Sequence, residues 1–274
     1  MKFLNQVSNI NKSMDQELFY EKNGEGEKTL IFFHGFGQNH KILSPWVELT
    51  NKQYTIYNFD LYYHGNSSRP DIILSPEEWK SLFANFLKEN NIDHFHLAAF
   101  SLGGRFALTT YQLFPEHTRS ITLVAPDGIY ENFWYLLAVS KGGNKLFKYF
   151  MLHPTVFNRF LKLVEKLKLT SSQMIRFAQK ELFTKENRKR VYRSWTYFRP
   201  LQPKLNLIND LIKSKKTPIH LILGSKDLLV PIDKIKSKMD KSESVYYHIL
   251  PLKHHQLIDG AKTLIPSLLE EVNL

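Results

Sequence analysis

The sequence predicts an α/β protein with a mostly parallel central sheet, helices on both faces of the sheet, and an inserted helical cap. Short apolar runs of strand length alternate with helical segments in residues 1–128 and 214–274, an order typical of a sheet buried between helices. Residues 129–213 are instead helical, aromatic and basic, without strand-like runs. We therefore expect residues 1–128 and 214–274 to form the α/β core and residues 129–213 to form the cap.

The composition excludes several classes of protein and site. The chain has 274 residues, of which 43% are hydrophobic and none is cysteine. The missing cysteines exclude disulfides, thiolate metal sites and a cysteine nucleophile. The first residues lack the apolar core of a signal peptide, and no stretch approaches the run of about 18 apolar residues that spans a bilayer. We therefore expect a cytoplasmic protein without a transmembrane segment.

The net charge of +11 is concentrated in the predicted insert. Residues 127–216 contain 19 lysines and arginines against 6 acidic residues, whereas the rest of the chain contains 18 against 20. Such a distribution indicates solvated basic faces. In a second hypothesis, the basic residues between 188 and 193 attract an anionic substrate or an anionic membrane surface. No nucleic-acid-binding motif accompanies the charge, so we expect no nucleic-acid partner. The oligomeric state is not predicted.

Apolar runs predict the strands of the α/β core, and residues typical of helix starts predict its helices. Continuous apolar runs at 29–33 and 54–59 indicate strands that are buried on both faces. Further strands are expected at 95–100, 121–125, 218–223 and 245–250, and an edge strand at 16–22. Ser75-Pro76-Glu77-Glu78 is typical of a helix start, and apolar side chains at helical spacing follow it through Leu87. Further helices are expected at about 44–49, 103–114, 233–239 and 260–272.

A serine stands between the strand expected at 95–100 and the helix after it. Ser101 has Ala99 two residues before it and Gly103 two residues after it. Small residues at these positions are typical of a nucleophile elbow, a sharp strand-to-helix turn that raises a serine hydroxyl above the sheet. The alternative interpretation is an ordinary serine at the N-cap of a helix. The residues that follow the other predicted strands distinguish between the two.

A serine nucleophile needs a histidine base and a carboxylate that orients this base. Catalytic groups gather at the carboxyl ends of parallel strands. Asp227 and His254 each come shortly after a predicted strand. Asp127 also follows a strand, and His255 is adjacent to His254, so these two residues remain alternatives for the acid and the base.

Four motifs over residues 28–127 and 216–274 resemble those of the α/β-hydrolase superfamily. In order, they are His34-Gly35-Phe36-Gly37, Asp60–Ser67, Ala99-Phe100-Ser101-Leu102-Gly103 and Gly224–Pro231. The resemblance implies an α/β-hydrolase fold whose catalytic residues are Ser101, Asp227 and His254, in the chain order of that family. It favours them over Asp127 and His255. It also implies an oxyanion hole formed by the backbone N–H groups of Phe36 and Leu102.

The resemblance implies a serine hydrolase that cleaves a carboxylic ester or thioester through a covalent acyl-enzyme. Its expected partner is a small-molecule acyl substrate, with no cofactor and no metal. The alternatives are a C–C bond hydrolase or lyase with the same triad, and a non-catalytic binding protein on this fold. Aromatic residues near both ends of the insert either cover an acyl pocket or attach the cap helices to the core, and these are Phe133, Trp134, Tyr135, Trp195, Tyr197 and Phe198.

Overall fold

The computed structural model describes residues 6–10, 17–131, 133–170, 172–239 and 242–270. The chain divides into two compact units. The first, here called the sheet unit, comprises residues 1–70, 75–130 and 201–274, and the second, the helical unit, comprises residues 71–74 and 131–200. Within the described residues, no helix has both the length and the apolar character needed to cross a membrane.

The sheet unit is built on an eight-stranded sheet in the order β1-β2-β4-β3-β5-β6-β7-β8. All neighbouring strands from β4 to β8 are parallel, whereas β2 pairs antiparallel with both β1 and β4. The strands are β1 (Gln6–Ile10), β2 (Leu18–Asn23), β3 (Lys28–Phe33), β4 (Tyr54–Phe59), β5 (Phe95–Phe100), β6 (Thr118–Val124), β7 (Ile219–Gly224) and β8 (Val245–Leu250). The predicted mostly parallel sheet is confirmed. The sequence did not predict β1, which pairs with β2, so β2 is not the edge strand that was expected.

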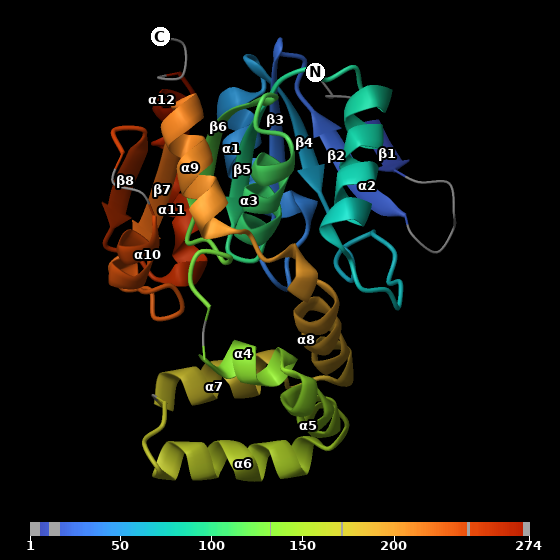
Figure 1. Ribbon diagram of the computed structural model, residues 1–274, viewed down its shortest axis with the longest axis vertical. Coiled ribbons are helices and arrows are strands. Elements are labelled where there is room, and N and C mark those ends of the chain that lie inside the picture. The colour runs from blue at the N-terminus through green and yellow to red at the C-terminus, as the bar shows by residue number, and fades with distance from the viewer. Residues whose placement is uncertain (1–5, 11–16, 132, 171, 240–241, 271–274) are drawn as a thin grey trace. The chain divides into compact units, whose positions relative to one another are not determined.

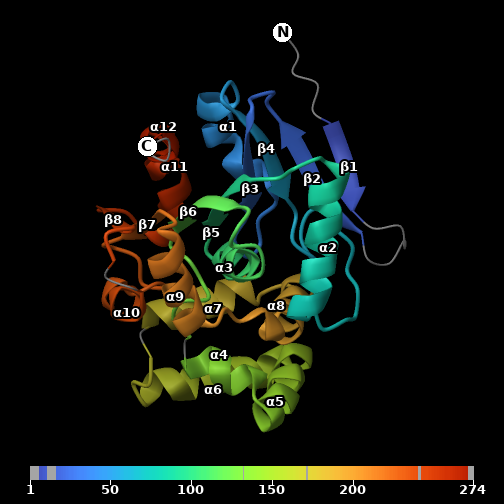
Figure 2. The ribbon, with the colours of Figure 1, turned by 45° about the horizontal axis from the view of Figure 1, so that its top comes forward.

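Helices cover both faces of this sheet, as predicted. Figures 1 and 2 show α2, α3 and α9 on one face and α1 and α11 on the other, and α12 packs beside α1. The helices of this unit are α1 (Ser44–Thr50), α2 (Pro76–Glu89), α3 (Gly103–Leu113), α9 (Leu205–Lys215), α10 (Ile232–Lys238), α11 (Leu257–Ala261) and α12 (Ile265–Glu270). Both layers are needed because the central strands are buried on both faces.

The helix start predicted at Ser75 is confirmed, and α2 begins directly after it. The Ser75 hydroxyl accepts a hydrogen bond from the Glu78 N–H (3.1 Å), and the Glu78 carboxylate accepts one from the Ser75 N–H (2.7 Å). This capping box satisfies two donors at the start of α2. On the inner face of α2, Trp79 and Phe83 pack against Phe33 of β3 at ring distances of 5.7 and 6.3 Å. The cap therefore fixes where α2 begins, and the aromatic rings fix which face it buries.

The C-terminal helix expected at about 260–272 is instead two short helices, α11 and α12. Pro266 lies in the first turn of α12, and a proline has no N–H to continue a helix from the preceding turn. The first helix also starts earlier than expected, because Leu257 and Ile258 are buried and the Trp46 indole N–H donates to the Ile258 carbonyl (2.8 Å). Positions 271 and 272 of the expected helix lie outside the described residues.

The helical unit consists of helices packed side by side. They are α4 (Phe133–Val139), α5 (Lys141–Leu152), α6 (Pro154–Lys166), α7 (Ser172–Glu181) and α8 (Lys185–Tyr197). Helix α5 packs beside α4, α6 and α8, and α6 packs beside α7. Residues 71–74 join this unit through an ion pair between Asp71 and Arg193 (2.8 Å) and a hydrogen bond from the Leu74 N–H to the Tyr197 carbonyl (2.8 Å).

The expected insert and the helical unit differ at the C-terminal boundary. The expectation extended the insert to residue 213, whereas the helical unit ends at Pro200 and α9 belongs to the sheet unit. Ile208 and Ile212 of α9 are fully buried, and α9 packs beside α3. Helical periodicity alone cannot show which core a helix covers, so α9 could not be assigned to the sheet unit from the sequence.

Candidate active site

Ser101 lies in a tight turn between β5 and α3. Its φ angle is +49°, which is unusual for a residue with a side chain. Its N–H donates to the Val124 carbonyl of β6 (3.0 Å), and its carbonyl accepts from the N–H groups of Gly104 (2.9 Å) and Asp127 (2.8 Å). These bonds to the neighbouring strand and the loop after it hold the strained turn. The residue before α3 is Leu102, so Ser101 does not occupy the N-cap position of this helix.

The turn at Ser101 restricts the size of the side chain at Gly103 more strictly than at Ala99. A Cβ atom added at Gly103 would lie 2.0 Å from the Phe33 carbonyl oxygen of β3. No side chain fits at that distance from a backbone atom. Ala99 is fully buried in β5, and its methyl group is accommodated there. The requirement for a small residue is therefore strict after Ser101 and weaker before it.

His254 contacts both Ser101 and Asp227. The Nε2 atom of His254 lies 3.0 Å from the Ser101 Oγ, and the Nδ1 atom lies 2.6 Å from the Asp227 Oδ2. The other carboxylate oxygen of Asp227 accepts from the N–H groups of Leu229 (2.8 Å) and Val230 (3.2 Å). With Nδ1–H donating to the carboxylate, Nε2 is left to accept the serine proton. The three side chains form one continuous hydrogen-bonded chain.

Each member of this chain follows a different strand. Ser101 follows β5, Asp227 lies in the loop after β7, and His254 begins the 3₁₀ turn His254–Gln256 after β8. Because these strands are parallel, their carboxyl ends meet at one edge of the sheet. Side chains that are far apart in the sequence are brought together there. The Asp227 side chain is fully buried and that of His254 is 17% exposed.

The two alternative residues have other surroundings. The Asp127 carboxylate pairs with the Arg105 guanidinium (2.9 Å) and accepts a hydrogen bond from the Gly128 N–H (2.7 Å). His255 is exposed to solvent. Of the two candidate acids and two candidate bases, the pair in mutual contact is Asp227 and His254.

The loop after β3 reaches the same edge of the sheet. Phe33 of β3 pairs with Ala99 of β5, so the residues that follow Phe33 lie level with Ser101. The Gln38 side chain accepts from the Gly35 N–H (3.0 Å), which fixes the loop. Among the described residues, neither the Phe36 N–H nor the Leu102 N–H donates to a backbone carbonyl. Both N–H groups are therefore available as donors at this edge.

A buried polar network supports this loop. Its members include His34, which belongs to the first of the four motifs, and His40, for which the sequence predicted no role. The Nε2 atom of His34 accepts from the Leu61 N–H (3.0 Å), while its Nδ1–H donates to the Gly35 carbonyl (2.7 Å). His34 thereby connects the loop after β3 to the loop after β4. The signal in the sequence is the position of His34 directly after an apolar strand.

Asp60 is the charged member of this network. Burial disfavours its ionised form, but hydrogen bonds from the His40 ring and N–H and from the Asn66 N–H outweigh burial, so the pKa of Asp60 lies below its ordinary value. The His40 N–H donates at 2.6 Å, the His40 Nδ1–H at 3.0 Å and the Asn66 N–H at 2.8 Å. Asp60 is thus an ionised residue directly after β4, at the same edge of the sheet as Ser101.

The chain segments just before and just after residues 131–200 are hydrogen-bonded within the sheet unit. On the way out, the Asp127 N–H is bonded to the Ser101 carbonyl. On the way back, the Gln202 side chain donates to the Gly128 carbonyl (3.1 Å), and the Leu201 carbonyl accepts from the Thr109 hydroxyl (2.8 Å). The segment that precedes residue 131 is therefore fixed to the turn at Ser101, and Gln202 is fixed to the same segment.

Within the helical unit, the aromatic residues fall into two groups. Trp195 stacks on Phe147 (5.3 Å between ring centroids) and meets Tyr135 edge-on (5.4 Å), so it joins α8 to α5 and α4. Phe133, in contrast, is 65% exposed. The first group packs the helices of this unit together, whereas Phe133 remains at its surface.

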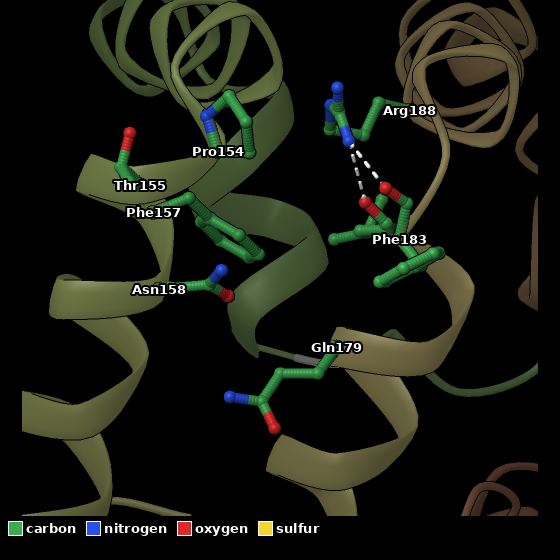
Figure 3. A pocket seen from close by; sticks show the side chains of 8 residues that line it. Pro154, Thr155, Phe157, Asn158, Gln179, Phe183 and Arg188 are labelled. Carbon is green, nitrogen blue, oxygen red and sulfur yellow. Dashed lines mark hydrogen bonds between the residues drawn. The ribbon is translucent and has the colours of Figure 1, made fainter.

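A cavity of about 400 Å³ lies between α6, α7 and the start of α8 (Figure 3). The Asn158 and Gln179 side chains extend toward it from α6 and α7. Arg188 donates to the carbonyls of Met151 (3.0 Å), Leu182 (3.1 Å) and Phe183 (2.8 Å). The lining residues are Pro154, Thr155, Phe157, Asn158, Gln179, Leu182, Phe183 and Arg188.

These contacts bear on the basic segment between 188 and 193. Arg188 is held by backbone carbonyls, and Arg193 pairs with Asp71 at 2.8 Å. Both side chains stabilise the helical unit. The hypothesis that the basic residues between 188 and 193 attract an anionic substrate or membrane surface stays a prediction. The described residues contain no cluster of three or more His, Asp or Glu side chains arranged to hold a metal ion.

Comparison with known proteins identifies related chains. A model of the α/β hydrolase fold family matches residues 28–261. A pimeloyl-[acyl-carrier protein] methyl ester esterase of Pseudoalteromonas atlantica is 22% identical over 82% of this chain and 85% of its own length. A crystal structure of a bacterial membrane phospholipase A superimposes with a TM-score of 0.67 at 18% identity, covering 99% of this chain and 87% of the other.

A second relative matches only in part. The dihydrolipoyllysine-residue acetyltransferase component of an acetoin cleaving system from Cupriavidus necator is 30% identical over 40% of this chain and 29% of its own length. The chain spans less than a third of the length of the first curated relatives that it matches. These relatives therefore share one region with the chain.

Proposed function

The chain belongs to the α/β hydrolase fold family, and from this premise we propose that it is a serine hydrolase that cleaves a carboxylic ester or thioester. The observation that carries the proposal is the hydrogen-bonded chain from Ser101 through His254 to Asp227. A serine hydroxyl is a weak nucleophile near neutral pH, and a base in contact with it removes that limit. A helix-capping serine would not need such a partner.

In the first half of the reaction, the Ser101 Oγ attacks the acyl carbonyl while His254 Nε2 takes the hydroxyl proton. A new Oγ–C bond forms and the carbonyl oxygen becomes an oxyanion. The N–H groups of Phe36 and Leu102 stabilise this charge. His254 then gives its proton to the leaving alcohol or thiol, the bond to the leaving group breaks, and an acyl-enzyme remains.

In the second half, water takes the place of the serine hydroxyl. His254 Nε2 removes a proton from water, the resulting oxygen attacks the acyl carbon, and the oxyanion forms again beside Phe36 and Leu102. The proton returns to the Ser101 Oγ as the acid leaves. Asp227 keeps Nδ1–H in place and stabilises the positively charged imidazole in both halves.

The relatives support an acyl substrate without naming one for this chain. One is called a methyl ester esterase, and a thioesterase domain from a curacin biosynthetic pathway shares the fold with a TM-score of 0.65 at 14% identity. We further propose that the helical unit acts as a cap that selects the acyl group. The bond from the Asp127 N–H, in the segment that leads to residues 131–200, to the Ser101 carbonyl supports this role.

A second candidate function is acyl transfer to an acceptor other than water. Several relatives that match part of the chain are called acyltransferases. The acyl-enzyme would be the same, and the second half would use an alcohol, amine or thiol as the nucleophile. Product analysis with and without an added alcohol separates the two functions, since a transferase forms a new ester faster than it releases free acid.

A fluorophosphonate probe tests the proposed nucleophile directly, because it forms a covalent bond with an activated serine only. We expect wild-type protein and His255→Ala to be labelled, and Ser101→Ala to remain unlabelled. Rates of hydrolysis of p-nitrophenyl esters of increasing acyl length, and of acyl-thioesters, then define the preferred substrate. Folded wild-type protein that resists the probe and cleaves none of these substrates would contradict the proposal and favour a non-catalytic binding protein.

A further inference from the structure

Helices α5 and α6 expose large apolar side chains that normally lie inside a protein. The most exposed of them is Leu152, at 66%. Single exposed apolar residues are common on protein surfaces, but a group of them marks an interaction site. In what we call the α5–α6 face, the exposed apolar side chains are Leu146, Tyr149, Leu152, Val156, Leu163, Leu167 and Leu169.

The spacing of these residues places them on the outer sides of the two helices. Along α5, Leu146, Tyr149 and Leu152 recur every three residues, whereas Phe147 and Met151 are buried inside the unit. Residues three or four apart lie on the same side of a helix. Along α6, the exposed positions 156 and 163 lie seven residues apart, and positions 161 and 164 are buried. Leu167 and Leu169 follow the end of this helix. Each helix therefore has an inner apolar side and an outer one.

Positive charge surrounds these apolar side chains. Between residues 141 and 170, all seven lysines and arginines are exposed and the only acidic residue is Glu165, the cations being Lys141, Lys145, Lys148, Arg159, Lys162, Lys166 and Lys168. The ion pairs found between Lys or Arg and carboxylates in the described residues lie elsewhere, for example at Arg193 and Lys215. The cations of this face are thus directed to solvent.

Phe183 adds an aromatic ring to the same region. Its side chain is 82% exposed, while its backbone carbonyl accepts a hydrogen bond from Arg188 (2.8 Å). It borders the cavity that Pro154 and Thr155, at the start of α6, also line (Figure 3). Arg188 also donates to the Met151 carbonyl near the end of α5. Phe183 is therefore held close to the corner between α5 and α6, where Leu152 is exposed.

We propose that the α5–α6 face, together with Phe183, binds the surface of an anionic lipid bilayer. The leucines and Phe183 enter the interface between headgroups and acyl chains, and the lysines and Arg159 contact the lipid phosphates. Lysine and arginine side chains can bury their carbon chains while their charges stay in water. Charge alone would suit any acidic partner. The combination of cations with exposed leucines is what favours lipid over an acidic protein.

Sedimentation with vesicles tests this proposal with the full-length protein. We expect wild-type protein to pellet with phosphatidylcholine vesicles that contain phosphatidylglycerol, and to remain in solution with phosphatidylcholine alone. Lys145→Glu/Lys148→Glu/Lys162→Glu should reduce the partition coefficient by about tenfold or more, because each cation contributes to attraction by an anionic surface. The matched control is Lys52→Glu/Lys80→Glu/Lys88→Glu, which reverses three exposed lysines of the sheet unit and should change binding by less than about twofold.

The apolar contribution has its own variants. Leu152→Ser/Phe183→Ser should also lower partitioning by about tenfold, whereas Leu49→Ser, at a leucine of the sheet unit that is 51% exposed, should not. All variants change exposed side chains, so thermal unfolding should be unaltered. Hydrolysis of a short soluble ester should be unaltered too, which separates this proposal from the proposed catalysis. If the wild type stays in solution with anionic vesicles, or if Leu152→Ser/Phe183→Ser binds them as the wild type does, the lipid assignment is overturned.

Discussion

The two units of the molecule differ in how many of their large apolar side chains are buried and how many are exposed to solvent. In the sheet unit, β5 and β7 are buried along their whole length, and aromatic rings from α2 fill the space above the sheet. The helical unit is much smaller, yet 12 of the 17 large apolar side chains that are exposed in the described residues belong to it. Dense burial fixes the positions of groups that must meet within tenths of an ångström. Exposed apolar surface instead serves contact with something outside the chain.

The sheet unit holds Ser101, His254 and Asp227 in contact. The largest loss of activity is therefore expected from a substitution that keeps the size of the Asp227 side chain but removes its charge. Asp227→Asn leaves the side chain in place but removes the carboxylate that accepts from His254 Nδ1–H. We expect kcat for a p-nitrophenyl ester to fall by about 10⁴-fold. Asp127→Asn, at the alternative acid, should lower kcat by less than about tenfold. Equal losses in the two variants would contradict the role of Asp227.

Removal of one aromatic ring should lower the free energy of unfolding by different amounts in the two units. Phe83 of the sheet unit is 1% exposed and lies within 6.5 Å of several other rings, whereas Phe183 of the helical unit is 82% exposed. Phe83→Ala should lower the free energy of unfolding by about 3–5 kcal/mol. Phe183→Ala should change it by less than about 0.5 kcal/mol. Urea unfolding of both variants measures the difference, and a large loss for Phe183→Ala would show that its ring is packed.

The parts of the structure that could be predicted from the sequence are those determined by local pattern. Continuous apolar runs indicated the parallel strands, and small residues around Ser101 indicated the turn. Asp227, Asp127, His254 and His255 were candidates because each lies shortly after a strand, and parallel strands bring their ends together. The resemblance to the α/β-hydrolase superfamily favoured Asp227 and His254, the two that are in contact. Their catalytic roles remain a prediction.

Other parts depend on contacts between distant residues and could not be read from local pattern. Arg188 has the sequence context of a solvated cation, but it donates to three backbone carbonyls. His40 lies in a polar stretch and still reaches the Asp60 carboxylate, which is buried after β4. The assignment of α9 to the sheet unit depends on what Ile208 and Ile212 touch. In each case the partner lies too far away in the sequence for spacing to reveal it.

The buried network around Asp60 should make the sheet unit sensitive to acid. The pKa of Asp60 is lower in the folded protein than in the unfolded chain. Its ionised form therefore contributes stability above a pH of about 4, and this contribution is lost as the pH falls through the folded pKa. Asp60→Asn should lower the free energy of unfolding at pH 7 by about 2 kcal/mol. The difference from wild type should shrink below pH about 4. A difference that stays constant between pH 7 and 3 would contradict this account.

A small effect is also expected from the ion pair between residues 71–74 and the rest of the helical unit. The Arg193 and Asp71 side chains are 27% and 69% exposed, so water screens their attraction. A double-mutant cycle with Arg193→Met and Asp71→Asn should give a coupling energy below about 1 kcal/mol. The helical unit would then be held mainly by rings such as Phe147 and Trp195, which stack at 5.3 Å. A coupling above about 2 kcal/mol would mean that the pair is effectively shielded from water, and that this unit, like the sheet unit, relies on a fixed polar contact.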